Sequence, residues 1–411
     1  MSIGVVDGVF TFAFDAMGTL TLSVILLLLG YAIKSKVAFL ERFCIPAPVV
    51  SGLLFALLNF ACHESKIAVF SLNTSYQSAF MNAFLVTVGL GAGLGIIKKG
   101  GKLMILYWIL SGILSISQNL IAWGVSSITG LEPMLGLMAG AIPLIGGHGS
   151  AAAFGETAES LGFSGAMAVA MAAATFGLIT GGLFGGPLAR RLIVKYDLKP
   201  DPNEVATSYK DMKAEDSTHV EEQATVLGYL KMIGLICVCI SLGVTLANWI
   251  STALDFTMPS YVGAMFIGIV VRNINDVFHI VKIDMERADM FGSVCLNIFL
   301  SYAMMTMEIW QLAGVAGPMI AILVVEVIFI LAYTYFVVFR VMGKGFDAAM
   351  MCAGMMGHGL GATPNAMANM GAVTERYGFS RNAYMIVPIV GAFLVEIVSI
   401  PNNTFFMNLF S

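Results

Sequence analysis

Two short stretches of the sequence combine glycine with polar residues in a way that suits the binding of small ions. The first is Gly146–Ser150, with the sequence Gly-Gly-His-Gly-Ser, and the second runs from Gly359 to Asn369. Glycine frees the backbone to turn, and threonine followed by proline is a start signal for a helix, so we expect Thr363 to cap a helix that holds Pro364 in its first turn. Ser150 is expected to cap a helix over 151–160 in the same way. Each stretch therefore predicts a helix, an unwound tip and a second helix.

The predicted tips have a definite chemistry. Bare N–H groups at a helix start favour an anion such as a carboxylate, so we expect the backbone of 147–151 and of 363–366 to hold carboxylate groups. Unwound carbonyls, together with Ser, Thr and Asn oxygens, favour Na⁺ or an amino group. The expected substrate-binding residues are Gly147, His148, Gly149, Ser150, Ala151, Gly361, Thr363, Pro364, Asn365 and Asn369.

Other polar residues lie inside long apolar runs, where they are costly and are candidates for function. Each of them either binds a cation or forms a hydrogen bond between helices, and His148 and His358 either bond a nearby carbonyl or contact substrate or a proton. The candidate sodium ligands are Ser150, Thr175, Gly359, Thr363, Asn369, Gln118, Asn119, Glu326 and Glu396.

The composition shows what kind of protein holds these residues. Of the 411 residues, 58% are hydrophobic and only 11% are charged, whereas about a quarter of a soluble domain is charged. The mean hydropathy is +0.88. The apolar runs are nearly continuous, which predicts an all-α polytopic membrane protein and excludes a porin-type barrel. The net charge of −4 offers no basic face for nucleic acid.

The cysteines lie mostly in apolar runs and are interpreted as packing thiols, so no transition-metal site is expected. No cleavable signal peptide is expected either. Ten membrane-spanning helices are predicted over 10–33, 45–62, 80–97, 103–128, 165–189, 225–250, 258–271, 290–307, 313–339 and 381–402. The two broken stretches, 134–160 and 346–374, are each long enough to enter the membrane partway and return, as a re-entrant hairpin.

The chain divides into two related halves. A polar, acidic linker over 194–223 separates a first repeat, 1–193, from a second, 224–411. Asn82-Ala-Phe-Leu matches Asn297-Ile-Phe-Leu at an offset of 215, and Gly162-Phe-Ser matches Gly378-Phe-Ser at an offset of 216. This near-constant offset predicts a duplication.

Basic residues predict the orientation of the two halves. With both termini on the periplasmic side and the linker in the cytoplasm, Lys66 is the one basic residue of 21 that lies outside. That asymmetry requires five spans and one re-entrant hairpin in each half, so the halves are inverted. Inverted repeats with broken helices at matching positions are typical of secondary transporters.

At Gly146–Ser150 and Gly359–Met370 the sequence closely resembles the bacterial sodium/glutamate symporters, and the resemblance continues through Ala173–Pro187, Thr374–Phe379 and Ile45–Gly52. It spans nearly the whole chain except the linker. The resemblance implies ten spans, two re-entrant loops in inverted halves, and uptake of L-glutamate driven by co-transported Na⁺ without an organic cofactor. It also implies a homodimer in the lipid of the bacterial inner membrane and an elevator-like motion of a transport domain.

Four positions depart from the family pattern. Ser150 and Asn365 stand where threonine is usual, Glu326 where glutamine is usual, and His358 where an aromatic residue is usual. Asn365 and His358 bear on the choice among glutamate, aspartate and their analogues, and Glu326 adds a carboxylate that bears on ion coupling.

Competing functions are weaker on the same residues. The sequence has no phosphate-binding loop for ATP drive, no His-Glu-x-x-His and no Gly-x-Ser-x-Gly, so no enzyme is expected. A proton-coupled transporter or a cation/proton antiporter of related architecture remains the alternative, and it would want carboxylates at the broken helices. We therefore expect an importer of L-glutamate coupled to Na⁺, in which the two tips clasp the ligand.

Overall fold

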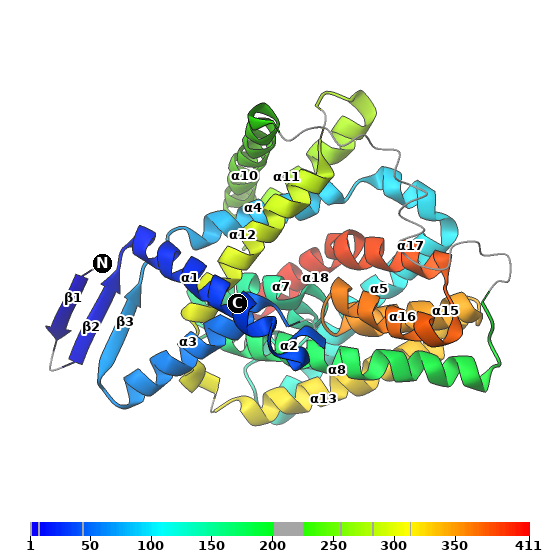
Figure 1. Ribbon diagram of the computed structural model, residues 1–411, viewed down its shortest axis with the longest axis horizontal. Coiled ribbons are helices and arrows are strands. Elements are labelled where there is room, and N and C mark those ends of the chain that lie inside the picture. The colour runs from blue at the N-terminus through cyan, green and yellow to red at the C-terminus, as the bar shows by residue number, and fades with distance from the viewer. Residues whose placement is uncertain are drawn as a thin grey trace.

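The computed structural model describes residues 2–6, 9–42, 45–200, 225–254, 257–281, 283–312 and 314–411. Most of these residues are helical (Figure 1). Nine of the described helices are long and apolar enough to cross a membrane. The chain is therefore a mostly helical, multi-pass membrane protein, as its composition predicts. The expected linker, 194–223, lies largely outside the described residues.

The helices of the first half are α1 (Ala16–Lys34), α2 (Ala38–Arg42), α3 (Ala47–Glu64), α4 (Gln77–Gly91), α5 (Leu94–Thr129), α6 (Pro133–Leu137), α7 (Ala141–Ser160) and α8 (Ala166–Lys195). Two of them are interrupted. Helix α5 breaks at Gly101 and α7 breaks at Gly147, and both glycines have a positive φ, which the absence of a Cβ permits.

The elements of the second half are α10 (Val226–Leu254), α11 (Ser260–Phe278), α12 (Met285–Met305), the 3₁₀ turn η1 (Ile309–Leu312), α13 (Ala316–Tyr333), the π-helical η2 (Thr334–Val338), α14 (Phe339–Val341), α15 (Phe346–Gly359), α16 (Thr363–Tyr377), α17 (Arg381–Ile389), the π-helical η3 (Val390–Leu394) and α18 (Val395–Phe410). The π-helical segments join α13 to α14 and α17 to α18 without ending the helix. Such segments often lie at functional sites.

A small sheet near the N-terminus shortens the first expected span. Strands β1 (Ser2–Val6), β2 (Val9–Phe14) and β3 (Ala68–Leu72) form a sheet in that order, with β2 antiparallel to β1 and parallel to β3. The expected span 10–33 therefore begins as a strand. Asp15 ends the strand and caps α1, because its side chain accepts a hydrogen bond from Gly18 N at 2.7 Å.

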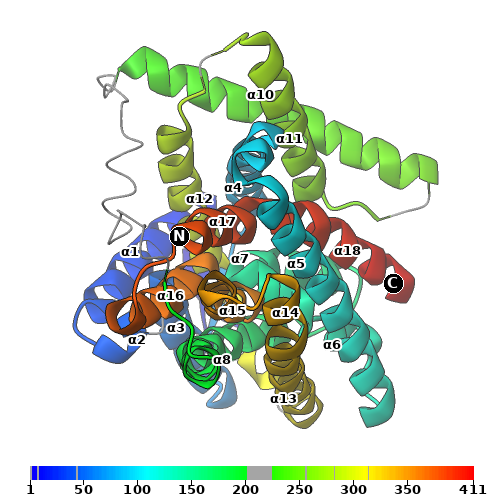
Figure 2. The same ribbon diagram turned by 90° about the vertical axis from the view of Figure 1, so that its right-hand side faces the viewer.

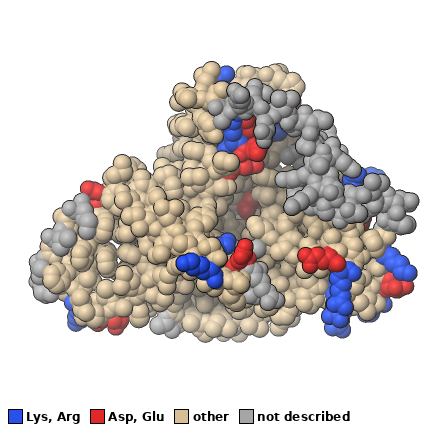
Figure 3. Space-filling view, in the orientation of Figure 1, with Lys and Arg blue, Asp and Glu red and all other residues tan. Residues whose placement is uncertain are grey.

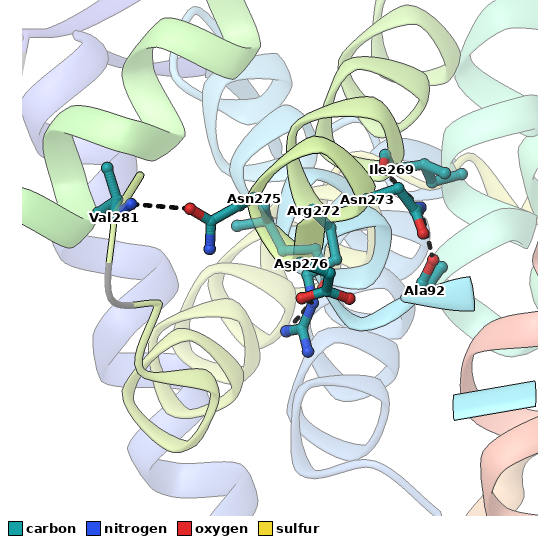
Figure 4. A network of polar contacts seen from close by, with 8 residues as sticks. Ala92, Ile269, Arg272, Asn273, Asn275, Asp276 and Val281 are labelled. Atoms are coloured by element: carbon teal, nitrogen blue, oxygen red, sulfur yellow. Dashed lines mark hydrogen bonds and ion pairs between the residues drawn. The ribbon is translucent and has the colours of Figure 1, made fainter. Parts of the chain in front are cut away.

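The expected span 80–97 differs most from the structure. It corresponds to α4, which has only 15 residues and is not among the nine long apolar helices. The backbone leaves the helix at Ala92 and Gly93. Figure 4 shows that the end of α11 holds this turn: Asn273 Nδ2 donates to Ala92 O at 3.3 Å, and the ion pair of Arg272 and Asp276 lies beside it.

The broken stretches occupy matching places in the two halves. Residues 134–160 form most of α6 and all of α7, and residues 346–374 form α15 and most of α16. Each is followed by a helical run of 30 residues, Ala166–Lys195 and Arg381–Phe410, and the two runs differ by 215 positions at both ends (166 to 381, 195 to 410). Both Pro46 and Pro259 stand directly before a helix, α3 and α11.

The helices pack into two groups (Figures 1 and 2). Helices α4, α10, α11 and α12 share one core, which includes Val86, Leu90, Ile236 and Ala264. A larger core draws mainly on α5–α8 and α13–α18. Charged side chains are sparse on the face seen in Figure 3, which suits a protein surrounded by lipid.

Candidate functional site

The two predicted tips lie against each other. The first tip is the break at Gly147, whose φ of 61° and ψ of −160° interrupt α7. The second tip is the turn of 360–362 between α15 and α16. A Cβ atom on Gly147 would lie 2.9 Å from the carbonyl oxygen of Gly361, so the backbones of the two tips are in contact. Residues more than 200 positions apart in the sequence therefore form one site.

Helices α15 and α16 form a tight antiparallel pair behind the second tip. A Cβ atom on Gly357 would lie 2.3 Å from Ala366 Cα, so glycine is what lets the two backbones approach. One turn further from the tip, Asn369 Nδ2 donates to Ala353 O at 3.3 Å. The helix, tip and helix expected over 346–374 are present.

The helix starts at the tips differ in detail from the expectation. Helix α16 begins at Thr363, and its N-cap is Ala362, which has no side chain able to cap. Thr363 therefore does not cap the helix, although Pro364 does lie in the first turn as expected. Ser150 is not a cap either, because α7 resumes directly after the break at Gly147. Without a side-chain cap, the backbone N–H groups at the start of α16 remain free to meet an anion.

Helix α8 holds the second tip by two buried amides. Asn365 Nδ2 donates to Leu178 O at 2.8 Å, and Asn369 Nδ2 donates to Gly181 O at 3.0 Å. A Cβ on Gly177 would lie 2.1 Å from the carbonyl oxygen of Leu360, so α8 and the tip touch directly. Both predicted asparagines thus position the tip, and Asn365 Oδ1 is buried without a hydrogen-bond partner among the described residues.

Two oxygen-bearing side chains meet beside the first tip. Ser150 Oγ would lie 2.2 Å, and Glu396 Oε1 3.9 Å, from a Cβ placed on Gly146. Glu396 comes from α18, directly after the π-helical segment η3. Its Oε2 atom is buried and has no hydrogen-bond partner in the described part of the chain. The predicted ligands Ser150 and Glu396 are therefore brought together.

His148 and Thr175 form the other side of the first tip. His148 Nε2 lies 3.0 Å from Thr175 Oγ1. Thr175 Oγ1 also donates to Met171 O at 3.0 Å, so it accepts from the histidine, which assigns the ring proton to Nε2. His148 is thereby held in one orientation between α7 and α8.

His358 lies at the second tip in a similar arrangement. Its Nε2 atom is 2.9 Å from Tyr107 Oη, and Tyr107 Oη lies 3.2 Å from Met351 O. Its Nδ1 atom is buried and has no partner among the described residues. His358 Cγ and Thr363 Oγ1 would each lie 3.2 Å from a Cβ on Gly391, which places the π-helical segment η3 against this tip.

Gln118 and Asn119 have different surroundings although they are adjacent. Gln118 Nε2 donates to Gly359 O at 3.0 Å and so reaches the second tip. Asn119 uses both ends of its amide, donating to Asn403 Oδ1 at 2.8 Å and accepting from Ala141 N at 3.0 Å. Asn119 therefore braces α5, α7 and α18, and Glu326 is fully buried on α13.

Sequence reasoning missed three residues that complete the site: Tyr107, Asn403 and Gly391. Tyr107 sits in an apolar run and Gly391 in a helix, so neither carries a local signal. Within the described residues, no group of three or more His, Cys, Asp or Glu side chains is arranged to hold a metal ion.

Comparison with known proteins decides the family. A family model described as sodium/glutamate symporter matches residues 12–379. The chain belongs to the sodium/glutamate symporter family. It is similar to the sodium/glutamate symporter of Escherichia coli (strain K12), with 39% identity over 393 residues, 94% of this chain and 96% of the relative. It is 36% identical to the sodium/glutamate symporter of Haemophilus influenzae over 391 residues, 95% of this chain and 96% of the relative.

The family membership confirms the resemblance that the tip motifs indicated. These relatives are named as symporters, so the chain is a transporter and not an enzyme. The two tips lie within the matched residues, since the match ends two positions after Tyr377, the last residue of α16.

Proposed function

We propose that this protein imports L-glutamate together with Na⁺ across the inner membrane of a bacterium. The observation that carries the proposal is the contact between the two glycine tips, Gly147 and Gly361, in a chain of the sodium/glutamate symporter family. Two half-helices that end at one point present free N–H groups and carbonyl oxygens together. Such an arrangement suits an anion bound with a cation.

The glutamate carboxylates bind to the N–H groups at the tips. The start of α16, from Thr363 to Ala366, supplies one set, and Gly147–Ala151 supplies the other. Sequence prediction left the positive charge for the substrate unexplained, because no Lys or Arg occurs in either tip. Helix dipoles and the co-transported Na⁺ compensate the carboxylates.

Sodium binds beside the first tip. Ser150 and Glu396 supply oxygens there, and the unpartnered Oε2 atom of Glu396 calls for a positive neighbour. Thr175, Thr363 and the carbonyl oxygens of the tips complete the proposed set. The amides of Asn119 and Asn369 hold helices together, and Gln118 and Glu326 lie at the far side of the second tip, so these four are left out.

The inverted-repeat architecture is supported by the equal helical runs after the two broken stretches. Five spans and one re-entrant hairpin make up each repeat, 1–193 and 224–411, with the linker in the cytoplasm and both termini in the periplasm. Helices α1 and α10 expose long apolar faces that suit lipid, for example at Leu28 and Leu242. The protein acts as a homodimer, as the resemblance implies.

An elevator mechanism is supported by the two packing groups. Helices α4 and α10–α12 share a core that holds none of the predicted site residues, whereas both tips lie in the group of α5–α8 and α13–α18. The second group is the proposed transport domain. It moves across the membrane against the first group and carries both tips with their ligands.

A proton-coupled transporter is the second candidate. The observation that favours it is Glu396, because this buried carboxylate lies beside the first tip, where such a transporter needs an acidic group. Proton coupling and sodium coupling predict different driving forces for the same uptake.

The test is uptake of labelled L-glutamate into liposomes that contain the purified protein. We expect uptake under an inward Na⁺ gradient and none under a proton gradient alone. Ser150→Ala should raise the Na⁺ concentration needed for half-maximal uptake, because it removes one proposed ligand. Ser127→Ala, an exposed serine on α5, is the matched control and should behave as the unmodified protein. Uptake driven by protons without Na⁺ would overturn the sodium proposal in favour of the second candidate.

A further inference from the structure

Helices α5 and α13 pack antiparallel and in register beside the second tip. Tyr333 Oη on α13 donates to Leu110 O on α5 at 2.9 Å. One turn on, Leu114 Cδ2 and Ile330 Cδ1 would each lie 2.7 Å from a Cβ on Gly359. Each turn forward along α5 therefore matches one turn back along α13.

The next turn brings Gln118 and Glu326 to the same level. Gln118 Nε2 donates to Gly359 O at 3.0 Å, which fixes the direction of the amide. Gln118 Oε1 is then left buried without a hydrogen-bond partner among the described residues. Glu326 is 0% exposed, and neither of its carboxylate oxygens has a partner in the described part of the chain. Three buried oxygens at one level thus lack any described donor.

The surroundings make an ionised carboxylate unfavourable. Helix α15 ends at Gly359, so the negative end of its dipole points to this level, as does the acceptor oxygen of Gln118. A buried charge without a partner is strongly destabilised. A positively charged species must therefore meet Glu326.

The titratable groups of the neighbouring helices are engaged elsewhere. Helix α13 packs against α5, α8 and α15. Tyr107 of α5 and His358 of α15 contact each other, Cys352 of α15 donates to Thr334 O, and Tyr333 donates to Leu110 O. The charged residues of the three neighbouring helices lie toward the helix ends: Lys98, Lys99, Lys102, Arg190, Arg191, Lys195 and Asp347.

We propose that Glu326 binds a proton, that its carboxyl group donates this proton to Gln118 Oε1, and that transport requires the proton to be present. The proposal rests on the proposed uptake of glutamate, which supplies its readout. A sodium ion fits less well, because hard cations are held by larger sets of oxygens. Gly359 O already accepts from Gln118 Nε2, so only three protein oxygens remain here. A proton needs one donor oxygen and one acceptor.

The direction of the pH dependence follows from this arrangement. Loss of the proton at high pH leaves a negative charge beside Gln118 Oε1 and the end of α15. Repulsion then separates α13 from the second tip and stops the transport cycle. Uptake should therefore fall as the pH rises, and a neutral residue at 326 should remove this fall.

The experiment compares uptake by the unmodified protein and Glu326→Gln at a series of pH values that are equal on both sides of the liposome, under one fixed Na⁺ gradient. The glutamine is neutral and can donate its amide to Gln118 Oε1. We expect the unmodified protein to lose most of its uptake at alkaline pH, and the variant to keep the same uptake across the series. Glu64→Gln, an exposed carboxylate on α3, is the matched control and should keep the alkaline loss.

Infrared spectroscopy of the unmodified protein gives a second readout that does not depend on a variant. A protonated carboxyl absorbs apart from a carboxylate, and its band should disappear in alkaline solution and be absent from Glu326→Gln. Equal pH profiles for both proteins, or no such band, would overturn the proposal. A higher Na⁺ requirement for Glu326→Gln at every pH would also overturn it, in favour of a sodium ligand. Failure of the unmodified protein to take up glutamate at any pH would instead refute the proposed function.

Discussion

At the scale of single residues, the break at Gly147 combines two demands that only glycine meets. Its φ of 61° is unfavourable for other residues, and a Cβ would lie 2.9 Å from Gly361 O. The strain of a left-handed conformation alone costs about 1–2 kcal/mol. Gly147→Ala should therefore separate the two tips and reduce the initial rate of glutamate uptake by roughly tenfold or more, since about 1.4 kcal/mol corresponds to a factor of ten.

The control for that prediction is Gly186→Ala on α8. Gly186 is helical and has nothing within 4 Å of the position of a Cβ. Alanine there should leave uptake unchanged and stabilise the helix by about 0.5–1 kcal/mol. Equal uptake by both variants would mean that contact between the tips is unimportant for transport.

The residues at the tips also show how far sequence reasoning reaches. Glycine, proline and polar residues clustered at Gly146–Ser150 and Gly359–Asn369 predicted both breaks, because these residue types have strong local preferences. The partners of Asn365 and Asn369 could not be predicted, since their amides bond carbonyls of α8, nearly 190 positions away. Thr363 was wrongly expected to cap α16, because the turn continues one residue closer to Thr363 than the motif suggests and makes Ala362 the cap.

At the scale of elements, Asn119 joins three helices. Its Oδ1 atom accepts from Ala141 N at the start of α7, and its Nδ2 atom donates to Asn403 on α18. Asn119→Ala would leave both buried partners without a hydrogen bond, at a cost of about 1–3 kcal/mol. We expect a lower midpoint of thermal unfolding in detergent for this variant. Asn248→Ala, at an exposed position of α10, should leave the midpoint unchanged.

If Asn119 bound sodium instead of bracing the helices, the outcome would differ. Asn119→Ala would then keep the unfolding midpoint measured without Na⁺ and would lose only the stabilisation that added Na⁺ provides. Measuring the midpoint with and without Na⁺ separates these roles, because a ligand stabilises only the state that binds it.

Element boundaries were predicted where hydropathy changes sharply and missed where it does not. Helices α8 and α11 begin within two residues of the expected spans, 165–189 and 258–271. Residues 9–14 are as apolar as the helix that follows, so their pairing with β1 and β3 left no hydropathy signal. Helix α4 ends early because the end of α11 bonds the turn at Ala92, which is a tertiary contact.

At the scale of the whole molecule, the two packing groups meet without merging. Phe154 of α7 belongs to the group that holds the tips, and Tyr261 of α11 belongs to the other. Their rings contact edge to face with centroids 5.5 Å apart. No sequence motif predicted this boundary, because a helix in a membrane is apolar on faces that meet lipid and on faces that meet another helix.

Relative motion of the two groups can be tested by linking them. In a variant without the native cysteines, Phe154→Cys and Tyr261→Cys joined by a short reducible bis-thiol reagent should abolish glutamate uptake, and reduction should restore it. Tyr196→Cys and Phe339→Cys are the matched pair, with ring centroids 5.3 Å apart and both residues in the group that holds the tips. Linking this pair should leave uptake unchanged. Continued uptake with the first pair linked would mean that α7 and α11 stay together through the cycle, because a tether of that length cannot follow one group as it slides past the other.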